Sequence, residues 1–145
     1  MKLIHALSAL FLAAATTSAF AEDAHTLMPD TLNLEIVDGS TVPDDCMYPA
    51  SITDTTRFEI ACVTMPAVIG SEVSSQYIGQ LGAHGWHQGN FVPGGMTAVR
   101  TDENNCSRVL NIFPSNYPPG EEHARVNVLW FALDRTPRCN EATPG

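Results

Sequence analysis

Apolar and polar residues alternate along several segments of the chain, with the period of two that is typical of half-buried β-strands. The first clear segment is TRFEIACVTM, residues 56–65, which Pro66 terminates. Four more follow Gly85, namely WHQGNFV, MTAVRT, CSRVLNIF and ARVNVLWFAL. Turn-forming stretches (PGG, DENN and PSNYPPGEEH) separate these four, so we predict an antiparallel meander. The last segment is almost wholly apolar from Val126 to Leu133, as expected of a central strand with both faces covered.

One segment has helical periodicity instead. In SEVSSQYIGQLGAHG, residues 71–85, apolar side chains recur at spacings of four, one and three, which places them on one face of a helix. Ser71 is a suitable N-cap, and Glu72 places an acid in the first turn. The order of elements is therefore strand, helix and four-strand meander. This order predicts a small two-layer α+β domain with one helix packed on the sheet.

The helix is predicted to end within LGAHGWHQG, residues 81–89. Gly85 suits the position just past a helix end, because glycine accepts a positive φ angle. Trp86 then follows Gly85 by one residue and can pack against Leu81, which precedes the cap residue His84 by three. We therefore predict a structural role for Leu81, Gly85 and Trp86 at the junction between helix and sheet.

Residues 1–21 have the features of a secretory signal peptide. Lys2 precedes an apolar stretch of signal-peptide length, and the small-x-small sequence AFA predicts cleavage after Ala21. No later apolar run approaches the length of a membrane span. The sequence thus predicts a periplasmic or secreted protein with no membrane insertion after cleavage.

The remaining chain divides by composition into two segments. Residues 22–50 are rich in Asp, Pro and Thr, and they predict an acidic, loop-rich N-terminal extension. Within it, alternation over residues 31–37 is compatible with an edge strand. Residues 51–145 then form the α+β domain.

The charge balance restricts the choice of partners. Lys2 is the only lysine, so the mature chain would carry six arginines against 16 acidic residues, a formal charge of 6 − 16 = −10. Such a chain repels phosphate backbones and anionic lipid, which argues against nucleic acid and membrane surfaces as partners. The partner expected instead is a protein or a small ligand in the cell envelope.

Four cysteines remain after cleavage, and an even number in an exported protein predicts two disulfides. Sequence alone allows three pairings. If the last two strands pair about a turn near Pro119, Cys106 lies opposite residue 132 or 133, and Cys139 can fold back to it. We therefore predict the disulfides Cys106–Cys139 and Cys46–Cys62.

His84 and His87 form the closest approach to a metal-binding motif. Gly85 separates them, however, and would place them in different elements, which favours the structural interpretation of this stretch. A copper or zinc site remains an alternative if distant residues such as His123 contribute ligands. No cofactor is expected.

Arg100, Arg108 and Arg125 lie in three successive predicted strands and could share a face of the sheet. Such a group could bind an anion or an acidic partner, because the guanidinium fork matches a carboxylate. Cross-strand pairing with Asp or Glu is the simpler alternative. A one-residue change of register would move Arg108 to the other face.

The chain contains no G-x-S-x-G, H-E-x-x-H, phosphate-binding glycine loop or C-x-x-C sequence. We therefore predict an exported, non-enzymatic accessory or binding protein that uses its sheet face or the loop at residues 114–123. An inhibitor of an extracellular enzyme would be one example. The alternatives are a metal-binding periplasmic protein and a small hydrolase.

Overall fold

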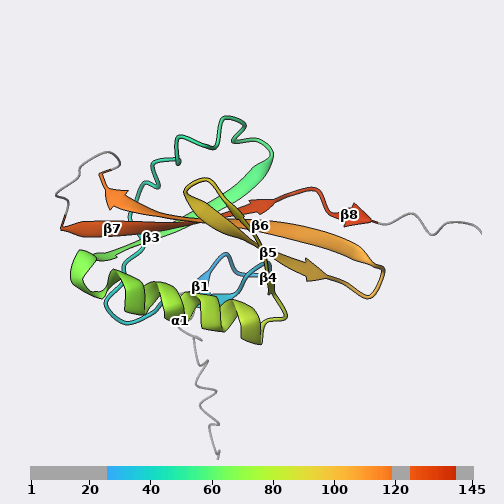
Figure 1. Ribbon diagram of the computed structural model, residues 1–145, viewed down its shortest axis with the longest axis horizontal. Coiled ribbons are helices and arrows are strands. Elements are labelled where there is room, and N and C mark those ends of the chain that lie inside the picture. The colour runs from blue at the N-terminus through green and yellow to red at the C-terminus, as the bar shows by residue number, and fades with distance from the viewer. Residues whose placement is uncertain (1–25, 119–124, 140–145) are drawn as a thin grey trace, which may run out of the picture.

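A single helix lies across one face of an antiparallel sheet (Figure 1). The computed structural model describes residues 26–118 and 125–139. The predicted signal peptide and His123 lie outside these residues. The elements in chain order are β1 (Thr26–Leu27), β2 (Leu34–Glu35), β3 (Phe58–Pro66), a 3-10 turn (Ala67–Ile69), α1 (Gly70–Ala83), β4 (His87–Val92), β5 (Gly95–Thr101), β6 (Cys106–Tyr117), β7 (Val126–Asp134) and β8 (Arg138–Cys139).

The predicted α+β class is confirmed, with one helix, a four-strand meander and two disulfides. The sheet order is β3-β7-β6-β5-β4, and the short β8 pairs with β6. The strand before the helix therefore lies beside the last strand of the meander, and β7 is central between β3 and β6. This position explains why β7 is apolar on both faces. Among the described residues, no helix is long and apolar enough to cross a membrane.

The register of the β6–β7 hairpin differs from the predicted one. Leu110 pairs with Leu133, whereas Cys106 pairs with Cys139 of β8 and not with residue 132 or 133. The predicted register is wrong because β6 continues as far as Tyr117, which pairs with Val126 of β7. Both predicted disulfides, Cys106–Cys139 and Cys46–Cys62, are nevertheless present.

The two faces of the sheet are covered by different parts of the chain. On the helix side, Phe131 and Leu133 of β7 belong to the main hydrophobic cluster together with apolar residues of α1. On the opposite side, Trp130 packs in a smaller cluster with Cys62 and Cys46. Figure 1 shows the segment before β3 crossing the side of the sheet away from α1. The Cys46–Cys62 disulfide thus fastens that segment over Trp130.

Residues 26–50, predicted as an extension, are loop-rich but pack into the same core as the sheet. Leu27, Leu32 and Leu34 are buried in the helix-side cluster. The predicted strand over residues 31–37 is reduced to β2, which pairs with β1 and not with the main sheet. The reason is a tight turn, in which residues 31–33 all donate backbone hydrogen bonds to the carbonyl of Met28.

Tyr77 of α1 joins this segment to the helix. Its hydroxyl accepts a hydrogen bond from the Val37 N–H at 3.1 Å and lies 2.8 Å from the Ser40 hydroxyl. Its ring contacts Phe131 edge to face, with the centroids 5.5 Å apart. This one buried side chain of the helix therefore contacts both the N-terminal segment and the sheet.

The helix ends in a Schellman motif. The Trp86 N–H donates to the Leu81 carbonyl at 3.0 Å, and the Gly85 N–H donates to the Gly82 carbonyl at 3.1 Å. Gly85 has a φ angle of 78°, in the left-handed region that glycine tolerates. Leu81 and Trp86 are both buried in the helix-side cluster. The stretch around Gly85 therefore joins the helix to the sheet.

Candidate functional site

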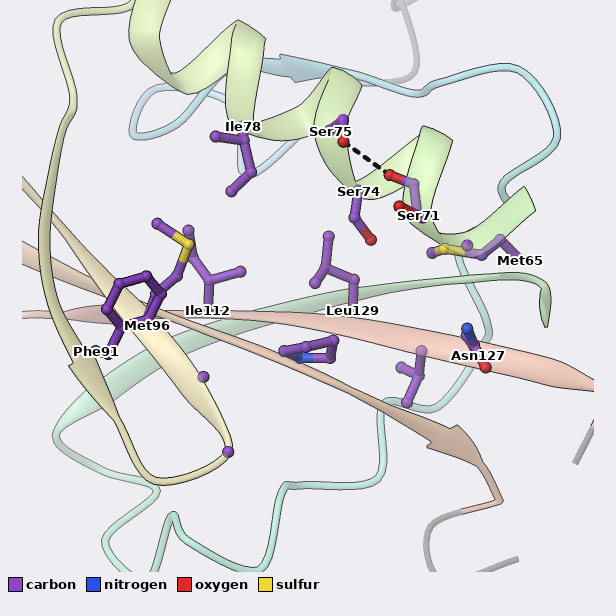
Figure 2. A pocket seen from close by; sticks show the side chains of 15 residues that line it. Met65, Ser71, Ser74, Ser75, Ile78, Phe91, Met96, Ile112, Asn127 and Leu129 are labelled. Atoms are coloured by element: carbon purple, nitrogen blue, oxygen red, sulfur yellow. Dashed lines mark hydrogen bonds between the residues drawn. The ribbon is translucent and has the colours of Figure 1, made fainter. Parts of the chain in front are cut away.

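An apolar groove of about 600 Å³ lies between the N-terminal half of α1 and the sheet (Figure 2). We call it the helix–sheet groove. Residues from α1, β3, β4, β5, β6 and β7 line it, and it is mostly apolar. The lining residues are Met65, Gly70, Ser71, Ser74, Ser75, Ile78, Phe91, Gly94, Gly95, Met96, Ile112, Pro114, Asn127, Val128 and Leu129.

A β-bulge in the edge strand β4 supplies one wall of the groove. Gln88 pairs with Ala98, but the register then shifts so that Phe91, and not Asn90, lies opposite Met96. The hydroxyl of Thr97 fills the bulge, because it accepts from the Asn90 N–H at 2.8 Å and donates to the Asn90 carbonyl at 3.0 Å. The bulge therefore brings the Phe91 ring to the groove, where it is 78% exposed.

Two glycines in the lining of the groove allow close approaches between elements. A Cβ atom on Gly95 would clash with the Ile112 carbonyl oxygen, so only glycine allows β5 to approach β6 this closely. A Cβ atom on Gly70 would clash with the side-chain amide nitrogen of Asn127. The first residue of α1 thus lies directly against the Asn127 amide.

The polar groups of the groove are few and gather at one end. Figure 2 shows Ser71, Ser74 and Asn127 on the side away from Phe91 and Met96. Ser75 donates its hydroxyl to the Ser71 carbonyl at 2.8 Å. Of the described residues that line the groove, none carries a formal charge. A ligand in this groove would meet a neutral, largely hydrocarbon surface with hydroxyl and amide groups at one end.

The structure separates the two candidate metal ligands. His84 caps the end of α1, and its Nδ1 lies 2.9 Å from the Leu32 carbonyl oxygen. Because a carbonyl only accepts, Nδ1 carries the hydrogen of this bond. His87 begins β4 and is exposed. Within residues 26–118 and 125–139, no three His, Cys, Asp or Glu side chains are grouped so that they could hold a metal ion.

The structure also divides the three arginines. Arg100 and Arg108 are directly opposite each other on β5 and β6. Arg125 precedes β7 at the other end of the sheet, where its carbonyl accepts from the Ala67 N–H. Arg100 and Arg108 are therefore neighbours across two strands, whereas Arg125 lies apart from them.

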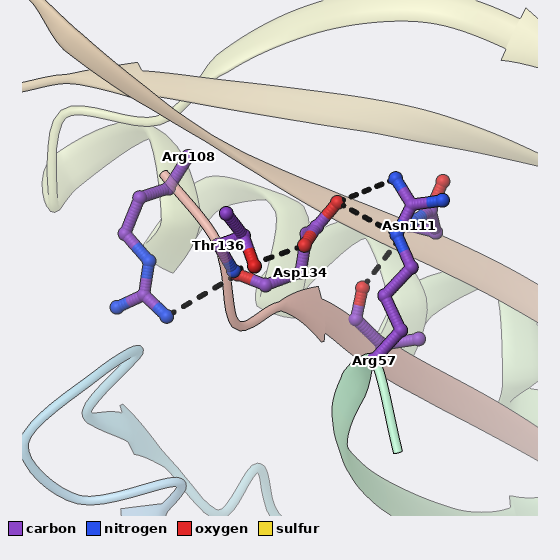
Figure 3. A network of polar contacts seen from close by, with 6 residues as sticks. Arg57, Arg108, Asn111, Asp134 and Thr136 are labelled. Atoms are coloured by element: carbon purple, nitrogen blue, oxygen red, sulfur yellow. Dashed lines mark hydrogen bonds and ion pairs between the residues drawn. The ribbon is translucent and has the colours of Figure 1, made fainter. Parts of the chain in front are cut away.

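A separate ion pair joins the ends of β3 and β7 (Figure 3). The Arg57 guanidinium donates to Asp134 Oδ2 from Nε at 3.1 Å and from Nη2 at 2.7 Å. The Thr136 N–H donates to Asp134 Oδ1 at 3.0 Å. The Asp134 side chain is 4% exposed and that of Arg57 is 49% exposed. These three hydrogen bonds all lie within the protein, so the role of the Arg57–Asp134 pair is structural.

The Asp134 carboxyl has a perturbed pKa. Burial alone would raise its pKa, but the hydrogen bonds from Arg57 and the Thr136 N–H, together with the Arg57 charge, lower it below the ordinary value. A carboxyl whose pKa is lowered by folding stabilises the fold above its unfolded-state pKa. That contribution is lost as the pH falls through the folded-state value.

We therefore expect Asp134→Asn to be less stable than the native protein at about pH 7, with a difference that shrinks toward about pH 2.5. The reason is that the unfolded carboxyl takes up its proton at a higher pH than the folded carboxyl, whose pKa is lowered, whereas the asparagine does not titrate. Urea unfolding at both pH values measures the difference. A difference in the free energy of unfolding that stays constant with pH would contradict the assignment.

Sequence reasoning did not identify the helix–sheet groove. Met65 and Met96 flank predicted strands and resemble ordinary core residues, while the serines of α1 resemble an ordinary solvent-facing surface. The only local signal is the Gly89-Asn90 pair within a predicted strand, because an internal glycine often marks a bulge.

In comparisons with known proteins, no family model, no curated protein and no solved structure matches the chain. The function is therefore inferred from the geometry of the groove and of the polar residues around it.

Proposed function

We propose that this protein is an exported, non-enzymatic binding protein that holds a neutral, mostly apolar ligand in the helix–sheet groove. The uncharged lining of the groove is the observation that carries the proposal. Two disulfides are typical of proteins in an oxidising compartment, which supports export. The predicted signal peptide at residues 1–21 supports the same location.

The size and lining of the groove favour a small molecule. Its volume of about 600 Å³ falls within the range of roughly 300–1,000 Å³ that is typical of ligand pockets. Hydrophobic walls with a few polar groups at fixed positions are the usual composition of such pockets. Met65 and Met96 add flexible thioether side chains that can adapt to an irregular apolar ligand.

Electrostatics indicates that the bound part of the ligand is neutral. The chain carries a formal net charge of −9, yet the described lining of the groove holds no charged side chain. An anionic group would lose its hydration in the groove without gaining a cation. We therefore assign the ligand to neutral amphiphiles, such as acyl esters, with the polar group near Ser71, Ser74 and Asn127 and the chain toward Phe91 and Met96.

Fluorescence of Nile red, a neutral apolar dye, tests the proposal. We expect a saturable increase in emission with the mature, oxidised protein, and competition by methyl octanoate that octanoate does not match at the same concentration. Ser74→Phe should weaken dye binding by at least about tenfold, because the added ring occupies the groove. Absence of saturable binding by the native protein would contradict the proposal.

Gln76→Phe is the matched control for the groove variant. Gln76 lies on the same helix, is exposed and does not line the groove. The same added ring at this position should leave dye affinity unchanged. Equal losses in the two variants would show that the dye binds elsewhere on the protein.

A further inference from the structure

Arg100 and Arg108 place two positive charges side by side, and no carboxylate among the described residues pairs with either of them. They are register partners on β5 and β6, so their Cβ atoms lie about 4.5–5.5 Å apart on one face of the sheet. Like charges in directly opposite positions destabilise a pair of strands. Among the described residues, the ion pair between Arg57 and Asp134 is the one found within 4.0 Å, so neither Arg100 nor Arg108 has a carboxylate partner there.

The contacts of the two side chains leave one buried hydrogen-bond donor, Arg108 Nε, without an acceptor among the described residues. The Arg100 guanidinium lies over the Trp86 ring, 5.0 Å from its centroid, which fixes its position. Arg108 donates from Nη2 to the Asp134 carbonyl at 3.4 Å (Figure 3). Its Nε is buried and has no hydrogen-bond partner within the described part of the chain. A buried donor in this state is costly, and it calls for a physical explanation.

A polar pocket of about 380 Å³ lies beside Arg100. The turn formed by residues 28–33 makes one wall of the pocket. The hydrogen bond between His84 Nδ1 and the Leu32 carbonyl holds this turn against the end of α1. Its lining is mainly polar, in contrast to the helix–sheet groove. The lining residues are Asp30, Thr31, Leu32, Asn33, His84 and Arg100.

We propose that this pocket binds the carboxylate of a small acid, held by the Arg100 guanidinium and by the positive charge of Arg108. The planar fork of Arg100 matches a carboxylate bidentately. Arg108 does not line the pocket, but it is the register partner of Arg100. Counted together with Asp30 and Arg100, it gives these three residues a net charge of one positive unit, which a singly charged carboxylate balances and a phosphate exceeds. This site is independent of the helix–sheet groove, and its ligand is of a different class.

Titration with sodium acetate, followed by the Nε–H resonance of Arg100 in the mature protein, tests the site. Acetate at constant ionic strength should shift this resonance saturably, in the millimolar range. Acetamide, a neutral molecule of the same shape, should not. Inorganic phosphate should bind more weakly than acetate. An Arg100 resonance that does not respond to acetate, or that responds equally to acetamide, would overturn the proposal.

Substitutions at the site and a control elsewhere sharpen the test. Arg100→Gln should abolish the acetate-dependent shifts of the neighbouring backbone, and Arg108→Gln should weaken binding by about tenfold. Arg125→Gln, at the other end of the sheet, should have no effect. If Arg100→Gln does not fold, Arg108→Gln and the native titration still decide the question. Equal affinities for acetate in Arg108→Gln and the native protein would count against the site.

Asp30→Asn should raise the affinity for acetate, whereas the substitutions of Arg100 and Arg108 should lower it. Asp30 has a φ angle of 70°, which asparagine also tolerates, so the backbone should be unchanged. Removal of its negative charge should strengthen acetate binding and should reduce the preference for acetate over phosphate. Weaker acetate binding in this variant would contradict the charge balance on which the proposal rests.

Discussion

Trp86→Ala is expected to destabilise the protein by about 3 kcal/mol, at the lower end of the range for a buried tryptophan. Trp86 is 3% exposed, and its backbone N–H completes the helix-terminating motif by bonding to Leu81. The substitution removes the packing of the ring against the helix-side cluster and the aromatic surface beneath Arg100. The loss is at the lower end because the buried indole Nε1 has no hydrogen-bond partner among the described residues. Urea unfolding measures the change.

His87→Ala is the matched control for this variant. His87 follows Trp86 directly but is exposed on the edge strand. Its replacement should change the free energy of unfolding by no more than about 0.5 kcal/mol. If Trp86→Ala proved as stable as His87→Ala, the account of the junction between helix and sheet would be wrong.

Removal of the Cys46–Cys62 disulfide, as Cys46→Ser with Cys62→Ala, is expected to cost about 3 kcal/mol. The two cysteines are 16 residues apart, and their covalent link restricts the unfolded chain. In the folded state, the link fastens the segment before β3 over Trp130. We therefore expect the folded variant to show Trp130 emission at longer wavelength, because water reaches the ring. Denaturant unfolding and the emission spectrum provide the two measurements.

Removal of the second disulfide, as Cys106→Ser with Cys139→Ser, separates these two effects. Its cysteines are 33 residues apart, and the longer loop predicts a loss of about 4 kcal/mol. Neither cysteine belongs to the cluster around Trp130, so the emission of the folded variant should stay unchanged. A red shift in this variant that matched the first would show that emission reports general loosening and not exposure of Trp130.

The elements that were predicted correctly are those whose signal lies in a few consecutive residues. Gly85 ends the helix through its own φ angle, and the apolar run of β7 follows from its place at the centre of the sheet. The hairpin register was predicted incorrectly, because it depends on how far β6 continues before the chain turns. The packing of Leu32 and Leu34 into the core could not be read from a loop-rich composition either, since it depends on tertiary contacts.

The candidate sites also divide into features that neighbouring residues indicate and features that depend on tertiary contacts. The opposition of Arg100 and Arg108 could be anticipated from neighbouring strands, but their register could not be fixed. The helix–sheet groove could not be predicted from the sequence, because it is a space that forms where several elements meet. Its existence depends on the bulge that brings Phe91, and not Asn90, opposite Met96. A periodic pattern of apolar residues indicates which side chains face inward but not where packing leaves a gap.

The central claim, that the helix–sheet groove binds a neutral apolar ligand, is tested most directly by labelling the methionine methyl groups and titrating methyl octanoate. Met65 and Met96 line the groove, whereas Met28 lies in the core and Met47 is exposed, so each protein sample contains its own controls. We predict saturable shifts of the Met65 and Met96 methyl resonances, with those of Met28 and Met47 unchanged. Unchanged Met65 and Met96 resonances, or shifts of all four to the same extent, would contradict the claim.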